Sequence, residues 1–213
     1  MDSNFIFEME DFIPKELCDD IIERFENEPQ KEQSTILETN NRVVIDLERR
    51  NSVHIHMRNM KDCKHIENEL DSKTKDAISV YKREFCNYFK KYSENPEYIN
   101  QTSFKYRPIK RSSEFDVHRV NPKSHQRWHS DEGEDYAHTG IIYLNNLDIE
   151  DGGATEFAYG KKVQPKAGKL LFFPGGWSNI HRGSFVHKRK YMIIFTTKFV
   201  IPKTWAPFII SQE

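Results

Sequence analysis

The chain has 213 residues, which is enough for one substantial hydrophobic core and too few for two well-filled domains. Its 32 Lys and Arg residues balance 33 Asp and Glu residues, so it lacks the basic excess that binding to nucleic-acid phosphates requires. Cys18, Cys63 and Cys86 form an odd set without CxxC spacing, which argues against a disulfide framework and a cysteine zinc site.

The sequence also indicates the cellular compartment in which the protein is expected. Residues 1–5 contain neither the basic region nor the apolar stretch of a signal peptide, and no window approaches 18 consecutive apolar residues. We therefore expect one domain over residues 1–213 in a reducing cytoplasm, without a nucleic-acid or membrane partner. Its oligomeric state is not predictable from these features.

The first helix is expected close to the N-terminus. Leu17, Ile21 and Phe25 fall on one face of a helix over residues 16–25, and Pro14 suits its opening turn.

Residues 1–96 are expected to be mainly helical. Apolar residues at spacings of three, four and eight predict a second, longer helix over about residues 64–92, with the polar stretch 71–76 as a candidate break. Two short strands are predicted between the helices, at residues 42–47 and 53–57.

After Pro96 the pattern changes to short apolar or alternating runs separated by turns rich in Gly and Pro. The candidate strands cover residues 114–120, 139–144, 154–159, 169–173 and 191–199. Many short strands at this spacing predict a β-sandwich or barrel over residues 97–201, with the N-terminal helices packed on one side.

The main chemical signal is the segment His129-Ser130-Asp131. In an extended strand, residues i and i+2 point to the same face, so the imidazole and the carboxylate can bind one ion. His181 follows fifty residues later, after the Gly175-Gly176 turn. Two imidazoles and one carboxylate leave the opposite face of a metal open, as non-haem Fe(II) oxygenases require. An HxD pair alone is a weak signal, and a solvated strand end is the alternative.

The residues around this pair resemble the core of a known family. The matching segments are 129–131, 139–146, 151–157 and 163–173, followed by His181 and Lys190. They resemble the double-stranded β-helix, or jelly-roll, core of the 2-oxoglutarate, Fe(II)-dependent oxygenases, in the prolyl-4-hydroxylase-like branch. The resemblance implies an α+β fold and the cofactors Fe(II), 2-oxoglutarate and O₂, with ascorbate as a supporting reductant. It implies that His129, Asp131 and His181 are the catalytic iron ligands.

The resemblance also implies which residues bind the cosubstrate. In the family, a basic residue nine or ten positions after the last histidine binds the distal carboxylate of 2-oxoglutarate, and Lys190 lies nine after His181. A carboxylate buried in a β-barrel needs a cation on physical grounds as well. Thr139 and Tyr143 lie four apart on one predicted strand, so their hydroxyls are candidates for two further hydrogen bonds to that carboxylate. For Tyr143 the alternative is a core tyrosine.

Several neighbours of these residues are further candidates. Thr155 matches a position that packs beside the active site in relatives, with ordinary strand residue as the alternative. Arg127, Trp128, Trp177 and Arg182 flank the iron ligands in sequence and are candidates for the substrate mouth, with exposed rim residues as the alternative.

The other histidines have simpler interpretations. His125 and His129 have the spacing of a helical zinc pair, but Gln126 stands where the HExxH motif has Glu. His54 and His56 share one face of a predicted strand without an attached acid, so we interpret them as ordinary strand histidines.

The resemblance predicts hydroxylation, because halogenating relatives lack the carboxylate that Asp131 supplies. Nucleic-acid demethylases usually carry paired arginines after the last histidine, whereas in residues 182–190 only one cation falls at the expected distance, so base repair is not expected. The first hypothesis is hydroxylation of a C–H bond of a prolyl or other residue in a protein or peptide, releasing succinate and CO₂. Residues 119–127 lack the tyrosine and glycine common in prolyl hydroxylases, and Phe185 stands where proline is frequent, so proline itself is not determined.

Two alternatives remain open. One is hydroxylation of a free amino acid or small metabolite. The other is a metal-binding or ligand-binding β-helix module without turnover.

Overall fold

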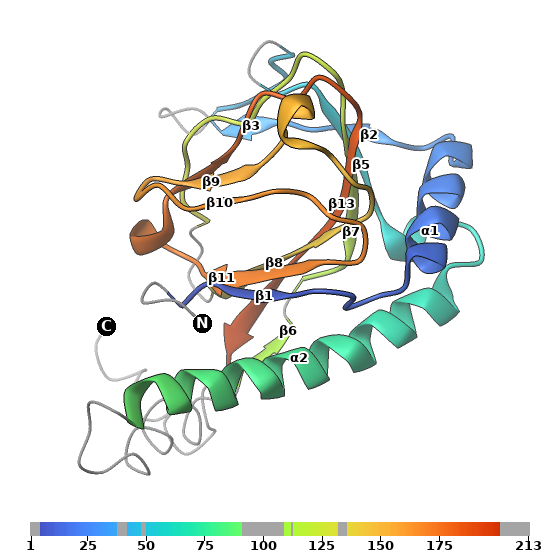
Figure 1. Cartoon of the computed structure of the whole chain (residues 1–213). Coiled ribbons are helices and arrows are strands. Elements are labelled where there is room, and N and C mark those ends of the chain that lie inside the picture. The colour runs from blue at the N-terminus through green and yellow to red at the C-terminus, as the bar shows by residue number, and fades with distance from the viewer. Residues whose placement is uncertain are drawn as a thin grey trace, which may run out of the picture.

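The computed structural model describes residues 5–37, 42–47, 50–90, 109–111, 113–131 and 136–200 (Figure 1). Two α-helices, α1 (Lys15–Asn27) and α2 (Lys64–Lys90), accompany an antiparallel β-structure. The strands are β1 (Phe7–Met9), β2 (Glu32–Gln33), β3 (Ile36–Leu37), β4 (Val43–Val44), β5 (Ser52–His56), β6 (Ile109–Arg111), β7 (Asp116–Val120), β8 (Tyr136–Tyr143), β9 (Thr155–Phe157), β10 (Lys162–Val163), β11 (Leu170–Pro174), β12 (His181–Gly183) and β13 (Lys190–Phe199).

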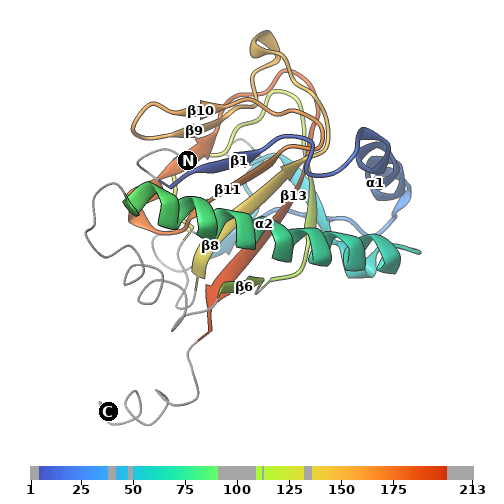
Figure 2. The same ribbon diagram turned by 60° about the horizontal axis from the view of Figure 1, so that its bottom comes forward.

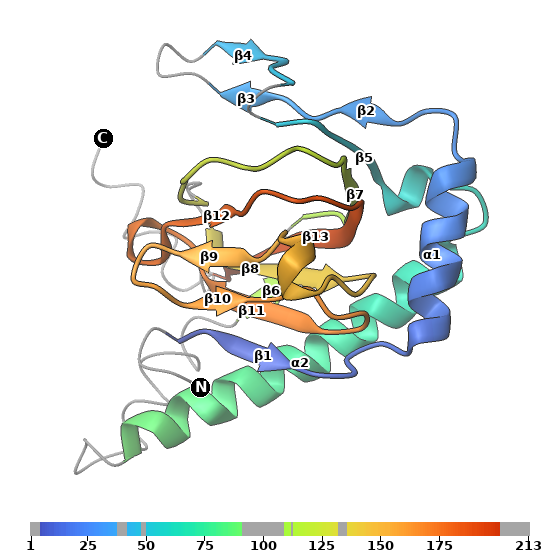
Figure 3. The ribbon, with the colours of Figure 1, turned by 45° about the horizontal axis from the view of Figure 1, so that its top comes forward.

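The strands form two facing sheets and a separate hairpin. The large sheet has eight strands in the order β1-β11-β8-β13-β7-β5-β2, with β6 also paired to β13. The small sheet has three strands in the order β10-β9-β12. Figure 3 shows the small sheet lying over the large one, while the β3–β4 hairpin extends away from both. This is the jelly-roll core expected for an α+β fold.

Strand alternation gives the large sheet two apolar faces. Ile142, Phe172 and Ile193 point to the helix side and belong to the larger core with the buried faces of α1 and α2. Their neighbours Ile141 and Leu171 point to the other side, where they form a second core with residues of the small sheet. The large sheet is therefore covered on both faces. Side-chain packing fixes its position relative to the helices on one face and the small sheet on the other.

The two helices cover the outer face of the large sheet, and Figure 2 shows α2 running across several of its strands. Both helices were predicted, but α2 is continuous through residues 71–76. Within that stretch Asp71 pairs with Lys75 and with Arg111 of β6, while Thr74 is buried. Asp71 and Lys75 thus have charged partners along an unbroken helix, whereas the buried Thr74 hydroxyl has no hydrogen-bond partner among the described residues. The candidate break was wrong.

Strands from residues 1–96 complete the large sheet. β5 pairs with β7, and β1 pairs with β11, so the β-core is not confined to residues 97–201. β1 has only three residues, too few for an alternating pattern to be recognised. Among the described residues, no helix is long and apolar enough to cross a membrane.

Candidate active site

The three predicted iron ligands meet in space. His129 and His181 form an isolated antiparallel bridge in which each backbone N–H donates to the other's carbonyl oxygen at 2.9 Å. The Asp131 carboxylate lies 3.5 Å from His129 Nε2 and 3.6 Å from His181 Nε2. Among the described residues, the HxD segment makes only this bridge and no regular strand, although its i, i+2 spacing was interpreted in terms of an extended strand. The bridge brings the two imidazoles side by side, with their ring centroids 4.3 Å apart.

Hydrogen bonds from the far ring nitrogens determine which way both imidazoles present their lone pairs. His129 Nδ1 lies 2.9 Å from the carbonyl oxygen of Arg127, and His181 Nδ1 lies 3.0 Å from that of Asn179. A carbonyl oxygen only accepts hydrogen bonds, so each Nδ1 carries the proton. In a neutral imidazole the other nitrogen, Nε2, is then an acceptor. Both Nε2 lone pairs face the region of the Asp131 carboxylate.

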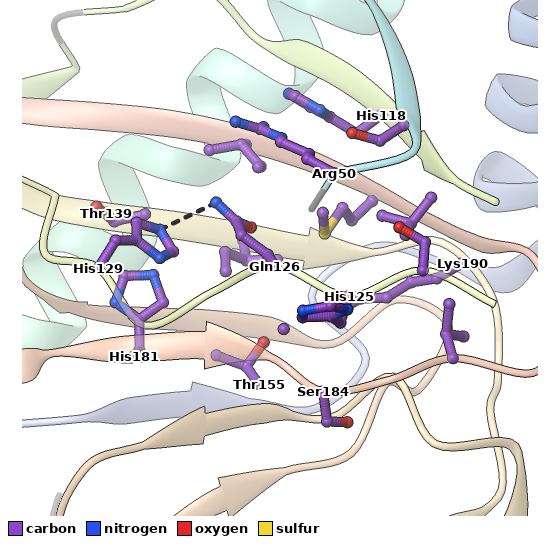
Figure 4. Close-up of a pocket in the computed structure, with 18 of the residues that line it drawn as sticks. Arg50, His118, His125, Gln126, His129, Thr139, Thr155, His181, Ser184 and Lys190 are labelled. Atoms are coloured by element: carbon purple, nitrogen blue, oxygen red, sulfur yellow. Dashed lines mark hydrogen bonds between the residues drawn. The ribbon is translucent and has the colours of Figure 1, made fainter. Parts of the chain in front are cut away.

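This arrangement fits a metal ion. Ligand atoms of His129, Asp131 and His181 all lie within 4.8 Å of one another, and none of them shares a proton with another in a normal hydrogen bond. Converging acceptors repel unless a metal ion or a proton lies between them. The set of two imidazoles and one carboxylate suits Fe(II). The amide of Gln126, 3.1 Å from His129 Nε2, would have to release that nitrogen, a change worth about 1 kcal/mol (Figure 4).

Asp131 is held in its charged form. Burial would raise its pKa, but His129, His181 and the Thr139 hydroxyl outweigh that effect and lower the pKa to about 2. Thr139 Oγ1 donates a hydrogen bond to Asp131 at 2.6 Å. Burial lowers the pKa of His181, which favours the neutral imidazole that a metal requires.

Lys190 is a buried cation in the same cavity. Its ammonium group is 2.8 Å from the carbonyl oxygen of Gly153, which belongs with Gly152 to one of the Gly-rich turns between the predicted strands. Both glycines have positive φ, and a Cβ on Gly152 would come within 2.0 Å of the Phe185 carbonyl oxygen. Burial lowers the pKa of Lys190 to about 7. Because no carboxylate of the described residues pairs with it, Lys190 is suited to an incoming anion.

The two hydroxyl groups predicted beside Lys190 have other partners. Thr139 contacts Asp131, as described above, and Tyr143 donates to Thr155 Oγ1 at 2.7 Å. Tyr143 is fully buried, which raises its pKa, and its ring lies 5.2 Å from the Lys190 ammonium. Thr155 itself lines the cavity, whereas Tyr143 does not. A role for Thr139 and Tyr143 in binding the cosubstrate stays a prediction.

One cavity of about 320 Å³ contains these groups (Figure 4). His129 and His181 lie towards one end of it and Lys190 towards the other, and the Asp131 carboxylate lies beside the two imidazoles. Its volume is near the lower end of the range of roughly 300–1,000 Å³ for small-molecule sites. The residues that line it do not include the four predicted for the substrate mouth, which are Arg127, Trp128, Trp177 and Arg182.

A second cluster of two histidines and an aspartate was missed. His54 of β5 lies opposite His118 of β7, and both imidazoles contact Asp116, which also lines the cavity. His54 and His56 were interpreted as ordinary strand histidines because their acid lies on a strand sixty residues away. The Asp-x-His spacing of Asp116 and His118 within a predicted strand was the signal that could have revealed the cluster. Arg50, at the same cavity, carried no recognisable signal.

Comparison with known proteins gives a family match. A family model described as the 2OG-Fe(II) oxygenase superfamily matches residues 115–200. The human protein named 2-oxoglutarate and iron-dependent oxygenase domain-containing protein 3 is 37% identical over 57 residues. That match covers 24% of this chain and 18% of the human protein, so the chain corresponds to a small part of that relative.

Solved structures share the fold over most of the chain. A viral collagen prolyl hydroxylase from Paramecium Bursaria Chlorella virus-1 is 16% identical with a TM-score of 0.56, covering 93% of this chain and 97% of that one. A Trichoplax adhaerens prolyl hydroxylase in complex with a hypoxia inducible factor peptide fragment is 15% identical with a TM-score of 0.68, covering 92% and 84%. A Pseudomonas putida prolyl-4-hydroxylase is 17% identical with a TM-score of 0.61, covering 92% and 94%.

Proposed function

We propose, from the premise that residues 115–200 belong to the 2OG-Fe(II) oxygenase superfamily, that this protein hydroxylates a C–H bond of a prolyl or other residue in a protein or peptide. Enzymes of this superfamily are dioxygenases that use Fe(II), 2-oxoglutarate and O₂. The reaction converts 2-oxoglutarate, O₂ and the substrate C–H into succinate, CO₂ and the hydroxylated product.

A single observation carries the proposal. The Nε2 atoms of His129 and His181 and the carboxylate of Asp131 converge as acceptors within 4.8 Å, with both Nδ1 atoms held by backbone carbonyl groups. We assign these three residues as the iron ligands. Iron with bound 2-oxoglutarate would supply the oxidising chemistry.

The chain's own residues then have distinct tasks. Arg127 and Asn179 orient the two imidazoles through their carbonyl oxygens, while the Thr139 hydroxyl orients the carboxylate of Asp131. Lys190 would bind the distal carboxylate of 2-oxoglutarate, and the Gly153 carbonyl positions its ammonium group. The apolar side chains of Ile141, Val186, Met192 and Ile194 line the same cavity and limit water near the reacting groups.

The choice of a peptide substrate is supported by what similar proteins act on. The Chlorella virus protein is a collagen prolyl hydroxylase, and the Trichoplax enzyme was solved with a peptide fragment bound. At 15–16% identity these relatives share the fold, and the substrate class for this chain remains our proposal.

The test separates iron chemistry from substrate choice. Fe(II) and 2-oxoglutarate are added without oxygen, and the visible charge-transfer band of the chelate is recorded. Oxygen is then admitted with and without proline-containing peptides, and succinate and peptide mass are measured. We expect the band, succinate, and a peptide that gains one oxygen atom. Absence of both band and succinate would contradict the enzyme assignment, whereas succinate without any modified peptide would contradict only the peptide substrate.

A further inference from the structure

The cavity contains a second cation besides Lys190. Arg50 lines the same cavity, and in Figure 4 its side chain extends towards the side on which His129 and His181 lie. Arg50 lies two residues before β5 and is partly buried. Among the described residues, its guanidinium makes one long hydrogen bond, 3.4 Å from Nη1 to the carbonyl oxygen of Thr35. No other described residue accepts a hydrogen bond from its five N–H donors.

No acid of the described residues forms an ion pair with Arg50. Asp116 and Asp131 are near enough to attract its charge, but each is already engaged elsewhere. Asp116 binds His54 and His118, and Asp131 receives the Thr139 hydrogen bond beside the proposed iron. Burial lowers the pKa of Arg50, which indicates that its charge is poorly solvated. A buried guanidinium without a close acidic partner among the described residues favours an anion entering the cavity.

The cosubstrate does not need this arginine. Under the proposed function, 2-oxoglutarate has the iron at one end and Lys190 at the other, so both of its carboxylates have partners. Lys190 is the first residue of β13, and Arg50 lies two residues before β5, a strand that is not a neighbour of β13 in the large sheet. Arg50 is then left for a different anionic group in a cavity that also admits the substrate.

We propose that Arg50 binds a carboxylate of the substrate, so that the enzyme selects molecules with a carboxylate near the oxidised carbon. This proposal rests on the iron and 2-oxoglutarate chemistry of the proposed function and adds a carboxylate to the description of its substrate. The planar guanidinium matches a carboxylate through two parallel hydrogen bonds. A singly charged carboxylate fits better than a phosphate, because Asp116 and Asp131 near the same guanidinium repel a second negative charge. The carboxylate comes either from an acidic side chain of a peptide or from a free amino acid.

Binding experiments without turnover test this proposal. The protein is loaded with Mn(II) and saturated with 2-oxoglutarate, so that Lys190 is occupied, and probes are titrated by calorimetry. One probe pair is L-proline and L-prolinamide. The other pair is acetyl-Ala-Pro-Glu-amide and acetyl-Ala-Pro-Gln-amide. In each pair the members differ mainly in one carboxylate, and the two pairs distinguish a free amino acid from an acidic peptide.

In the wild type, the acid member of one pair should bind about tenfold more tightly than its amide, as expected for one charge-assisted contact. Arg50→Gln should remove that preference, and Arg50→Lys should keep part of it because the charge remains without the planar fork. The control is Arg58→Gln, since Arg58 is an exposed arginine paired with Glu114 and does not line the cavity. Thermal unfolding of each variant checks that it folds.

Two results would overturn the proposal. The first is equal binding, or no binding, of acid and amide in both pairs by the wild type. The second is a loss of 2-oxoglutarate affinity in Arg50→Gln as large as that in Lys190→Ala, which would assign Arg50 to the cosubstrate. Failure of the proposed function looks different, because Fe(II)-dependent succinate formation would then be absent whatever the binding preference.

Discussion

Two clusters of the same composition border one cavity and differ in spacing. The open cluster consists of His129, Asp131 and His181, and the closed cluster consists of His54, Asp116 and His118; each gathers its ligand atoms within 4.8 Å. In the open cluster the imidazole nitrogens lie 3.5 and 3.6 Å from the carboxylate. In the closed cluster those distances are 2.9 and 3.0 Å, which are hydrogen-bond lengths.

The difference follows from the partner of each ring N–H. Backbone carbonyls of Arg127 and Asn179 take the N–H groups in the open cluster, so the remaining nitrogens present lone pairs to the carboxylate. In the closed cluster the N–H groups point at the carboxylate itself, and His118 Nδ1 is buried without a hydrogen-bond partner. Residue types alone therefore do not identify a metal site. Where a backbone carbonyl accepts the hydrogen bond from one ring nitrogen, the other nitrogen is free to bind a metal ion. Where the carboxylate itself accepts that hydrogen bond, a proton lies between imidazole and carboxylate instead.

The largest expected effect is a difference in metal binding and turnover between variants of the open and the closed cluster. Asp131→Ala should reduce Fe(II)-dependent succinate formation to background, because it removes the only carboxylate of the ligand set. Asp116→Ala should retain one tightly bound ion per chain. Metal stoichiometry and succinate are measured for both variants. Two tightly bound ions in the wild type, or turnover by Asp131→Ala, would remove the distinction.

The next effect concerns the cosubstrate. Lys190→Ala should weaken 2-oxoglutarate binding by about 3–5 kcal/mol if it removes one partner of a buried ion pair, while Asp116→Ala should change it little. Titration of the Mn(II)-loaded protein measures both affinities. Lys188→Ala is the matched control, since Lys188 is an exposed lysine paired with Asp151. An unchanged affinity in Lys190→Ala would assign the distal carboxylate to another cation.

A smaller effect appears in the stability of the metal-free protein. Asp116→Ala should lower the free energy of unfolding by about 1–3 kcal/mol, because it leaves His54 and the buried His118 without their acceptor. Asp131→Ala should lower the free energy of unfolding by less. It removes the hydrogen bond from Thr139, but it also relieves the repulsion among converging acceptors. Urea unfolding in the presence of a chelator compares them. An equal loss in both variants would indicate that the two clusters are held together in the same way.

The smallest expected effect is the pH dependence of the difference in unfolding free energy between the wild type and Asp116→Ala. The hydrogen bond with Asp116 raises the pKa of His54 above 6.5, so the stabilisation by this pair is complete below that pH and is lost as pH rises through the raised pKa. Burial opposes ionisation of Asp116, but the hydrogen bonds from His118 and His54 prevail and lower its pKa, so its contribution is lost only in strong acid. Burial is the main cause of the lowered pKa of His118. Because His118 is buried in both proteins, its titration contributes little to the difference in stability between the wild type and Asp116→Ala.

Unfolding of wild type and Asp116→Ala at several pH values measures this prediction. Their difference in stability should be largest between about pH 4 and pH 6.5 and should shrink above that range. A difference that grows with pH above 6.5 would have the wrong sign for a protonated His54 paired with Asp116.

Local patterns predicted the elements that are long or strongly periodic. Helices α1 and α2 and the strands β7, β8, β9, β11 and β13 lie where their spacing and turns indicated. Short strands such as β1 and β12 were missed, because three residues carry no period. Lys190 was predicted from its distance to His181, and the structure adds its burial and its contact with Gly153.

By itself, the sequence determined the residue types of the open cluster, their order, and the family resemblance around them. Only the tertiary structure decided that β5 pairs with β7 in the register that brings His54 and His118 to Asp116. It also decided that Thr139 contacts Asp131 and that Arg50 reaches the cavity. The physical reason is that alternation along a strand tells which face a side chain occupies, whereas register between distant strands depends on the packing of the whole sheet.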